Sequence, residues 1–514
     1  MVERRSSTEI GDDELSADVV VIGSGMGGGT VARALAPSGV SVLIVERGDY
    51  LPREPQNWSP REVFLNTRYK NAERWYDAHT GIAFAPGVHY YVGGNTKVYG
   101  ACLPRFRERD FEIIEHAEGS SPAWPIRYAD IEPYYAQAER LLKVHGDDTA
   151  DPTAPPRSSP YPYSPLAHEP AVERLAVAFE AQGVHPFHMP MGVDLSGTGT
   201  CIRCGTCDGF PCKLGAKSDA ETSMVSPALE YPAVRLVPRT RVVRLETDDK
   251  GERLTAAVAQ RDGRIVRIRG THFVLAAGAV NSAALLLSSA SDTHPRGLAN
   301  SSDLVGRHYM THNSTFLIGI DPRRRNDVTF QKTLGLNDWY FAAADNAKPL
   351  GNVQMLGKLQ GAMVKPARRW VPMPLLENAM AHSIDLYLTT EDLPHHDNRV
   401  SVDADGRIKI ARRPNNLSSH AELLRRMRHL LRKAGYPLVF SQTMGIETNS
   451  HMCGTAVMGN DPASSVIGPF GRTHDVRNLW ITDSSGFPSS AALNPALTIA
   501  ANALRVADLG GLSC

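Results

Sequence analysis

Two side chains in the last quarter of the chain, His451 and Asn494, are of types that can move or hold a proton. His451 stands in the segment SHMCGT, and Asn494 directly precedes Pro495. An imidazole exchanges protons near neutral pH because its unperturbed pKa is about 6.5. An Asn amide can orient a hydroxyl and donate to a developing oxyanion without titrating. Each residue also has a structural interpretation: a hydrogen-bonded histidine, and a cap for a helix that begins near Pro495.

Near the N-terminus, residues 17–22 form a β-branched run that ends at a glycine, which is typical of a buried parallel strand. Residues 26–36 are predicted to form a helix, and residues 40–45 a second buried strand. The three segments together have the length of a βαβ unit, the element that carries dinucleotide sites.

The turn between this first strand and its helix, GSGMGG, fits the pattern G-x-G-x-x-G. Gly23 permits the tight turn, Gly25 lets the backbone approach a pyrophosphate, and Gly28 lets the helix pack closely on the strand. Glu46 ends the second strand, where an acidic residue usually binds a ribose hydroxyl and repels a 2′-phosphate. The sequence therefore predicts a dinucleotide site and disfavours NADP.

FAD is favoured over NAD by two later segments. Residues 273–287 place Gly278 between an apolar strand and a helix, and residues 478–485 form a third apolar strand that ends in Asp483. A ribityl-diphosphate chain, rich in hydroxyls, needs such an acceptor near a second crossing of the chain, whereas an NAD enzyme needs neither element.

The region between the glycine turn and the C-terminal segment contains further predicted strands and helices. Residues 234–245, 256–268 and 271–277 are predicted as strands, with a turn at Asp262-Gly263 and a helix over 281–289. Residues 314–413 contain alternating segments, 383–388 and 398–402 among them, which indicate an inserted antiparallel sheet. A basic amphipathic helix is expected over 421–434.

Composition narrows the class of protein. The chain has 514 residues, enough for two domains, and 55 basic and 55 acidic side chains, so its formal net charge is zero. A nucleic-acid binder would carry a basic excess. No apolar run is long enough to span a membrane, and residues 1–16 lack the apolar core of a signal peptide, so we expect a cytoplasmic protein without a membrane partner.

These residues together resemble the glucose–methanol–choline (GMC) oxidoreductase family over nearly the whole chain. The resemblance is carried by the glycine turn with Glu46, by VGGNTKVYGACLPR at 92–105, by the Ala276-Ala277-Gly278 turn and by the C-terminal block. Within the family, GGNTKVYG and CIRCGTCDGFPC look most like the bacterial branch related to pyranose oxidases and glycoside 3-oxidases.

The resemblance implies an α/β fold in which a Rossmann-like FAD domain is interleaved with a substrate domain on an antiparallel sheet. The FAD domain would comprise residues 15–120, 200–312 and 446–510, and the substrate domain 121–199 and 313–445. It also implies that the loop Gly93–Gly100, here called the flavin loop, lies along the flavin. Some pyranose oxidases attach FAD through a His of this loop, but Val98 stands at that position, so FAD is expected to be non-covalent.

By the same resemblance, His451 is the catalytic base, Asn494 its partner, and both touch the substrate together with Gln354. The implied cofactor contacts are Gly23, Gly25, Gly28, Glu46, Arg47, Gly94, Asn95, Thr96, Gly100, Val242, Ala277, Gly278, Asp483, Asn494, Pro495 and Thr498. No metal ligand is among them.

Four cysteines, Cys201, Cys204, Cys207 and Cys212, follow the spacing C-x2-C-x2-C-x4-C. An iron–sulfur cluster and a zinc site are both chemically open, although iron–sulfur motifs differ in the last spacing. The alternative is a compact loop with free thiols or a local disulfide, which we favour because the related oxidases use FAD alone.

The expected function is FAD-dependent oxidation of a secondary hydroxyl of a sugar or glycoside to a ketone, with C3 as the candidate carbon. Hydride would pass to flavin N5, and O2 or a quinone-like acceptor would reoxidise the flavin. Two alternatives stay open: a dehydrogenase of another alcohol such as a sterol or polyol, and an electron-transfer subunit that uses the cysteine cluster. The substrate, the acceptor and the oligomeric state are not fixed by the sequence.

Overall fold

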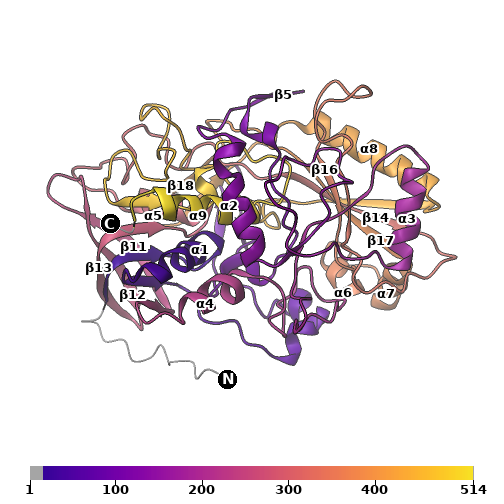
Figure 1. The fold of residues 1–514 in the computed structure, drawn as a ribbon, viewed down its shortest axis with the longest axis horizontal. Coiled ribbons are helices and arrows are strands. Elements are labelled where there is room, and N and C mark those ends of the chain that lie inside the picture. Colours follow the sequence, from indigo (N-terminus) through magenta and orange to yellow (C-terminus); the bar gives the residue numbers. More distant parts are fainter. Residues whose placement is uncertain (1–14, 513–514) are drawn as a thin grey trace.

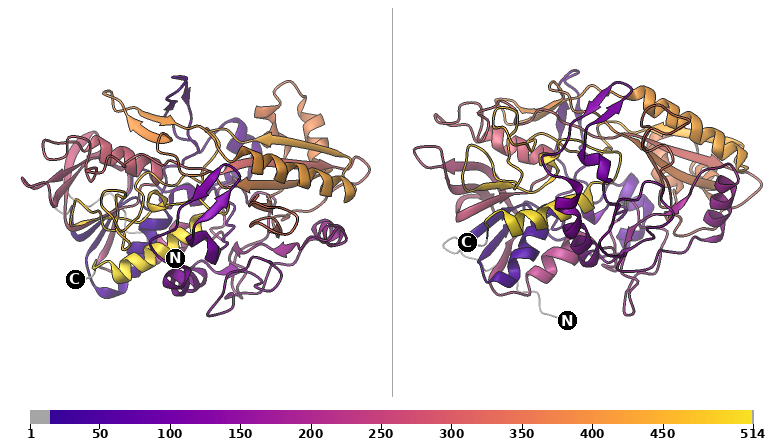
Figure 2. Two further views of the ribbon diagram at one scale, coloured as in Figure 1. Left: turned by 90° about the horizontal axis from the view of Figure 1, so that it is seen from above. Right: turned by 45° about the horizontal axis from the view of Figure 1, so that its top comes forward.

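A computed structural model describes residues 15–512, and two bodies of regular structure are visible in it (Figure 1). One is built on a mainly parallel sheet with α1 (Met26–Leu35), α5 (Ala279–Ser288) and α9 (Ala496–Leu509) (Figures 1 and 2). The other is built on an antiparallel sheet with α8 (Leu417–Lys433). The fold is the mixed α/β arrangement expected from the sequence. The expectation about a signal peptide concerns residues 1–14, which lie outside the described residues.

The first sheet has the order β10-β2-β1-β13-β12-β11, with β21 also paired to β13. The β-branched residues of β1 and β2 are buried because helices cover both faces of the parallel part. Its strands are β1 (Ser16–Ile22), β2 (Val42–Val45), β10 (Val234–Val237), β11 (Thr240–Thr247), β12 (Leu254–Arg261), β13 (Arg264–Leu275) and β21 (Leu479–Ile481).

Two expected strands differ from the structure. Residues 234–245 form two strands, because Pro238 interrupts the ladder and Arg239 takes a positive φ of 52°. The first half, β10, runs parallel to β2, whereas β11 pairs antiparallel with β12. Residues 264–275 form one long strand, β13, that leaves the hairpin with β12 and continues into the parallel sheet beside β1.

The second sheet has the order β20-β14-β17-β16-β15-β8, and its pairings are antiparallel. The helix α8 covers it, and the buried Leu423, Met427 and Leu430 of that helix pack against the aliphatic side chains of β14 and β17 (Figure 2). The strands are β8 (Phe187–His188), β14 (Asn313–Ile320), β15 (Leu334–Leu336), β16 (Asn352–Met355), β17 (Ser383–Thr390) and β20 (Leu438–Thr443).

The segment 398–402 was expected in this inserted sheet, and that expectation was wrong. It forms β18 (Arg399–Val402), which pairs with β19 (Ile408–Ala411) across a turn at Asp405-Gly406. β19 then joins β3 (Trp75–Asp77), which pairs with β4 (Ala83–Phe84). These strands make a separate small sheet whose apolar side chains belong to the core of the first body.

The helices are α1 (Met26–Leu35), α2 (Tyr128–Leu141), α3 (Pro170–Glu180), α4 (Ser226–Ala228), α5 (Ala279–Ser288), α6 (Gly361–Val364), α7 (Met373–Ala381), α8 (Leu417–Lys433) and α9 (Ala496–Leu509). Short strands β5 (Ile114–His116) and β6 (Gly119–Ser121) form a hairpin, and β7 (Val144–His145) pairs with β9 (Met191–Gly192). The helix α8 begins before the expected residue 421 because Ser419 and His420 are also buried against the sheet.

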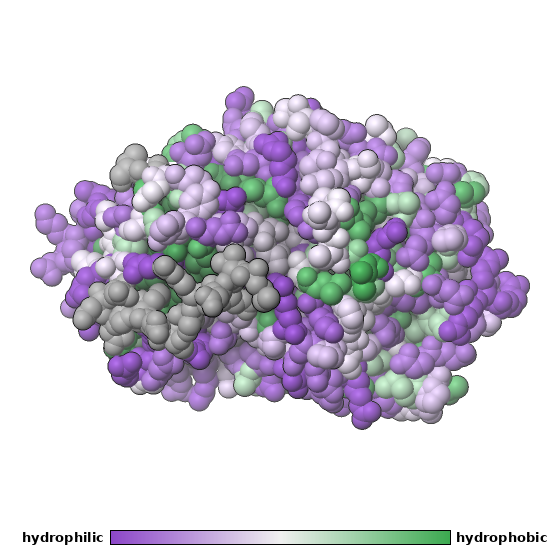
Figure 3. Space-filling view, turned by 60° about the horizontal axis from the view of Figure 1, so that its bottom comes forward, coloured by the Kyte–Doolittle hydropathy of each residue, from purple (hydrophilic) through white to green (hydrophobic). Residues whose placement is uncertain are grey.

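Polar and charged side chains cover most of the face shown in Figure 3, and apolar residues form small groups between them. No helix within residues 15–512 is both long and apolar enough to cross a membrane.

Candidate active site

The glycine turn between β1 and α1 has the geometry that the three expected roles require. Gly23 has a φ of +103°, which L side chains rarely adopt. A Cβ on Gly28 would lie 2.0 Å from the Gly23 carbonyl oxygen, so only glycine lets α1 begin this close to the strand. A Cβ on Gly25 would meet no described atom within 4 Å. The N-terminus of α1 thus faces open space at the position where a pyrophosphate would approach.

Glu46 follows β2 and is held beside this turn. Its Oε2 accepts hydrogen bonds from the Ser24 hydroxyl at 2.6 Å and the Ser24 N–H at 3.0 Å, and its Oε1 accepts the Gly48 N–H at 2.8 Å. The side chain is therefore fixed where a ribose hydroxyl could reach it. The Arg47 guanidinium is engaged with other side chains, since it pairs with Glu73 at 2.8 Å and lies over the Tyr90 ring.

The flavin loop lies against the glycine turn. A Cβ on Gly94 would come within 3.3 Å of the Gly25 Cα. The Asn95 side chain accepts the His89 N–H at 2.8 Å, and the Thr96 hydroxyl donates to the Gly93 carbonyl and accepts the Ala220 N–H. The side chains of Asn95 and Thr96 thus hold the shape of the loop itself.

A buried ion cluster anchors the same loop. The Lys97 ammonium lies 2.9 Å from Asp219 and 2.5 Å from Glu221, and its side chain is only 5% exposed. Both carboxylates raise the pKa of Lys97 although burial opposes them. Sequence reasoning missed this cluster, because the partners lie more than 120 residues away.

Asp483 joins two elements of the first body. Its Oδ2 accepts the Gly278 N–H at 2.8 Å and the Ser282 hydroxyl at 2.5 Å, while Oδ1 accepts the Ser485 N–H at 2.9 Å. The carboxylate thus fixes the N-terminus of α5 to the turn after β21. A Cβ on Gly278 would meet no described atom within 4 Å, so there is open space beside this glycine. The Ala277 N–H beside it donates to the Ser282 hydroxyl oxygen at 3.1 Å.

The remaining expected cofactor contacts are spread over other elements. Val242 is partly buried in β11 next to a register shift, and Pro495 precedes the first residue of α9. The Thr498 hydroxyl lies 2.7 Å from the Tyr135 hydroxyl in the buried contact between α9 and α2. A Cβ on Gly100 would lie 2.9 Å from Asp208 Oδ1. Of this group, the Thr498 side chain is already engaged within the protein.

His451 is brought to His312 by backbone pairing. Met310 and Cys453 exchange two N–H···O hydrogen bonds of 3.0 Å in an antiparallel bridge. Two residues along in opposite directions, His312 and His451 face each other, and their Nδ1 atoms lie 3.2 Å apart. The Asn449 amide donates to the His312 carbonyl at 2.7 Å and accepts the His451 N–H at 3.2 Å, which locks the pairing.

Burial sets the protonation of both histidines. It lowers the pKa of His451 to about 4, and burial together with the charge of His451 lowers the pKa of His312 to about 3. Both rings are therefore neutral at neutral pH, as a general base must be before it takes a proton. Sequence reasoning missed His312, since its partner lies 139 residues away.

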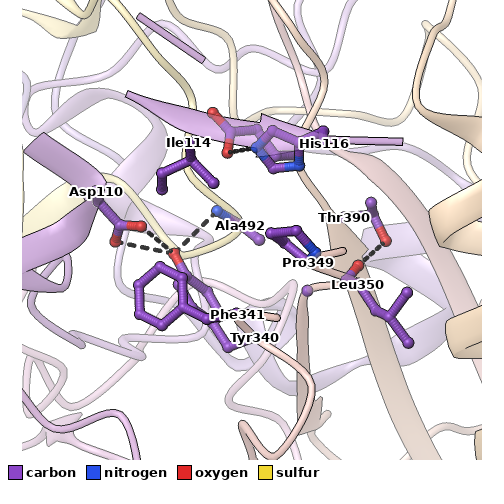
Figure 4. A pocket seen from close by; sticks show the side chains of 11 residues that line it. Asp110, Ile114, His116, Tyr340, Phe341, Pro349, Leu350, Thr390 and Ala492 are labelled. Atoms are coloured by element: carbon purple, nitrogen blue, oxygen red, sulfur yellow. Dashed lines mark hydrogen bonds and ion pairs between the residues drawn. The ribbon is translucent and has the colours of Figure 1, made fainter. Parts of the chain in front are cut away.

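The loop that carries Asn494 is clamped just before that residue. The Ala492 N–H donates to the Tyr340 hydroxyl at 3.3 Å, and the Ala492 carbonyl accepts the Thr389 hydroxyl at 2.7 Å. Figure 4 shows Tyr340 between Ala492 and Asp110, whose carboxylate oxygens accept its hydroxyl at 2.9 and 3.0 Å. Burial raises the pKa of Asp110 to about 7.

The cap position of α9 is Pro495, which has helical backbone angles and no side-chain cap hydrogen bond, and Asn494 directly precedes it. The same loop reaches the histidines through Ser490, whose carbonyl oxygen lies 3.2 Å from His312 Nε2.

Gln354 lies on the sheet face that carries the histidine contact. It pairs with Tyr387 across β16 and β17, so the two side chains share a face. The Tyr387 ring lies 6.3 Å from the His451 ring. Gln354 is 5% exposed, and its Oε1 has no hydrogen-bond partner among residues 15–512. A buried acceptor without a partner is costly unless a ligand supplies the donor.

The four cysteines of the 201–212 segment are free, partly buried and line one pocket. The segment packs on the flavin loop, because the Gly209 N–H donates to the Val98 carbonyl and the buried Lys217 donates to the carbonyls of Tyr99 and Cys207. Between residues 15 and 512, no three His, Cys, Asp or Glu side chains are placed to hold a metal ion. The contacts that are present are those of a compact supporting loop.

Comparison with known proteins gives two family matches, both described as GMC oxidoreductase, over residues 89–314 and 394–503. The chain is 32% identical to the 6′′′-hydroxyparomomycin C oxidase of Streptomyces lividus, covering 98% of this chain and 92% of that protein. It is 31% identical to the paromamine 6′-oxidase of Streptomyces fradiae, covering 98% and 93%. The fructose dehydrogenase large subunit of Gluconobacter japonicus is 26% identical, covering 97% and 98%.

Among solved structures, pyridoxine 4-oxidase from Mesorbium loti superposes with a TM-score of 0.65 at 17% identity, covering 96% of this chain and 98% of that one. A formate oxidase superposes with a TM-score of 0.68 at 15% identity, covering 96% and 97%. At this identity the two structures support the fold alone.

Proposed function

Because the chain belongs to the GMC oxidoreductase family, whose members act on CH–OH groups, we propose that it oxidises a hydroxyl group of a sugar or aminoglycoside with non-covalent FAD. The observation that carries the proposal is the neutral His451 near Tyr387, which shares a sheet face with Gln354. His451 meets His312, whose other ring nitrogen contacts the loop of Asn494 at Ser490.

The residues present fit FAD. The N-terminus of α1 has no side-chain cap hydrogen bond and can present backbone N–H groups to a diphosphate. Gly25 and Gly278 leave the space that a larger residue would fill. Glu46 is held where it can accept a ribose hydroxyl. Val98 stands in the flavin loop where a covalent link would need a nucleophile, which supports release of intact FAD on denaturation.

FAD, when bound, supplies the acceptor for the hydride of the substrate carbon. The protein supplies the rest. His451 takes the hydroxyl proton, because burial keeps its imidazole neutral. The Asn494 amide donates to the developing alkoxide, and the buried Gln354 Oε1 accepts a neighbouring hydroxyl of the sugar. The clamp on Ala492 holds the Asn494 loop in place while the bonds change.

The position of the oxidised carbon is the finer part of the proposal. The narrower resemblance to glycoside 3-oxidases favours a secondary hydroxyl at C3, whereas one relative is named for position 6′. O2 or a quinone-like molecule would accept the electrons afterwards. An electron-transfer role for the cysteine segment has no geometric support among the described residues, and oxidation of a sterol or polyol is the alternative that a substrate panel tests.

Anaerobic rapid mixing with neutral sugars, glycosides, aminoglycosides, polyols and sterols tests the proposal directly. Loss of flavin absorbance with the sugars or aminoglycosides, with the carbon identified from the product, is the expected result. His451→Ala should slow this reduction by about two orders of magnitude or more while FAD stays bound. Reduction only by polyols or sterols, or an unchanged rate in the variant, would contradict it. Recovery of the colour in air, with peroxide formed, identifies O2 as the acceptor.

A further inference from the structure

His312 occupies a position in the site that no sequence motif indicated. It contacts the segments of both expected catalytic residues, through His451 on one side and the Ser490 carbonyl, four residues before Asn494, on the other. Its side chain is buried, being only 2% exposed, and it directly precedes β14 of the antiparallel sheet. A ring held in this way can fix the proton positions of its neighbour.

The hydrogen-bond partners determine which nitrogen of His312 carries its proton. A carbonyl oxygen only accepts, so the Nε2 atom that lies 3.2 Å from the Ser490 oxygen must be the N–H donor. His312 is neutral at neutral pH because burial lowers its pKa to about 3, so it holds a single ring proton. Its Nδ1 is therefore an acceptor.

The same argument determines which nitrogen of His451 carries its proton. Its Nδ1 lies 3.2 Å from the acceptor Nδ1 of His312, so it must carry the N–H. Since His451 is also neutral, its Nε2 is left with a free lone pair. An isolated imidazole has no such constraint and can place its proton on either nitrogen.

We propose that His312 is a positioning residue that fixes the tautomer of His451, so that Nε2 of His451 is the atom that takes the substrate proton. The order of hydrogen bonds runs from His451 Nδ1–H to His312 Nδ1, and from His312 Nε2–H to the Ser490 carbonyl. The same hydrogen bonds, here called the relay, connect the loop of Asn494 to His451, so the positions of the two catalytic groups are linked. The inference rests on the proposed role of His451 as base.

Two substitutions separate this role from simple packing. His312→Leu keeps an apolar volume but removes both hydrogen bonds. His312→Gln keeps a donor for Ser490 and an acceptor for His451. The limiting rate of anaerobic flavin reduction should fall about 10-fold or more in His312→Leu and recover most of that loss in His312→Gln. Equal losses in the two variants, or no loss in His312→Leu, would overturn the proposal.

A double-mutant cycle tests whether His312 acts through His451. If it does, adding His312→Leu to His451→Ala should change the rate of flavin reduction less than about 2-fold further. A full additional loss would show a separate structural effect and refute the relay. If His451→Ala itself leaves the rate unchanged, the proposed base is wrong; if His451→Ala is slow and His312→Leu is normal, only the relay is wrong.

The tautomer can also be observed without turnover. Magic-angle-spinning ¹⁵N NMR of protein labelled on its histidine rings distinguishes protonated from bare ring nitrogens, and the His451→Ala spectrum identifies the His451 signals. We expect a protonated Nδ1 and a bare Nε2 for His451 in the wild type and in His312→Gln, and a mixture in His312→Leu. A protonated Nε2 in the wild type would contradict the assignment.

Discussion

The protonation of His451 leads to a sharp prediction about pH. Burial lowers its pKa to about 4, against about 6.5 for an unperturbed imidazole. A base works only in its neutral form, so the rate rises with pH through the pKa and is constant above it. At pH 5.5, a group with a pKa near 4 is about 97% neutral, whereas one with a pKa near 6.5 is about 9% neutral.

The limiting rate of anaerobic flavin reduction should therefore be nearly constant between about pH 5.5 and 8, and should decline only as the pH approaches 4. Stopped-flow measurement at saturating substrate gives this rate, and a substrate deuterated at the reacting carbon shows that C–H cleavage is being followed. His429→Ala, which removes an exposed histidine of α8, is the matched control and should give the same profile. A fall of about 10-fold between pH 8 and 5.5 would show that His451 is not shielded as the structure indicates.

Three further outcomes follow from the same geometry. Lys97→Met leaves two buried carboxylates without their cation and should lower the free energy of unfolding, measured by urea denaturation, by about 3–5 kcal/mol. The control Lys433→Met, at an exposed position, should change this free energy little. Equal effects of the two substitutions would refute the role of the cluster. Gly28→Ala places a Cβ 2.0 Å from a carbonyl oxygen and should lower the midpoint of thermal unfolding. Gly25→Ala places a Cβ that meets no described atom within 4 Å, so the variant should keep the fold but retain less FAD. The FAD content is read from the ratio of visible to ultraviolet absorbance. The reverse ranking would argue against a pyrophosphate at Gly25. Gln354→Met removes the unpartnered buried oxygen and should lower kcat/KM for the best substrate by roughly 10- to 100-fold with FAD content unchanged; an unchanged kcat/KM would remove Gln354 from the substrate site.

Local sequence signals predicted the N-terminal βαβ unit well. The β-branched run of β1, the glycines of the turn and Glu46 at the end of β2 are all within one βαβ unit. Such a unit is formed by contacts between near neighbours, so residue type and spacing are enough to specify it. The hairpin of β12 and β13 was predicted for the same reason, since its turn residues lie between its strands.

A prediction that depended on contacts between distant parts of the chain was wrong. The segment 398–402 alternates like a strand of the inserted sheet, yet it pairs with β19 beside β3, because alternation reports a half-buried strand and not which sheet buries it. Asp483 stays a predicted cofactor contact, and the structure adds that its carboxylate accepts hydrogen bonds from Gly278 and Ser282, which no local pattern reveals.

The amino-acid sequence alone identifies His451 and Asn494 as candidates, because they stand in segments that resemble those of one family of oxidoreductases. How His451 is held depends on contacts between distant parts of the folded chain. The bridge between Met310 and Cys453 places His312 opposite His451, and residues far apart in the chain meet only when the two bodies have folded together. Because the tautomer of a histidine is set by whichever group its other nitrogen meets, the active nitrogen of His451 is a property of the fold.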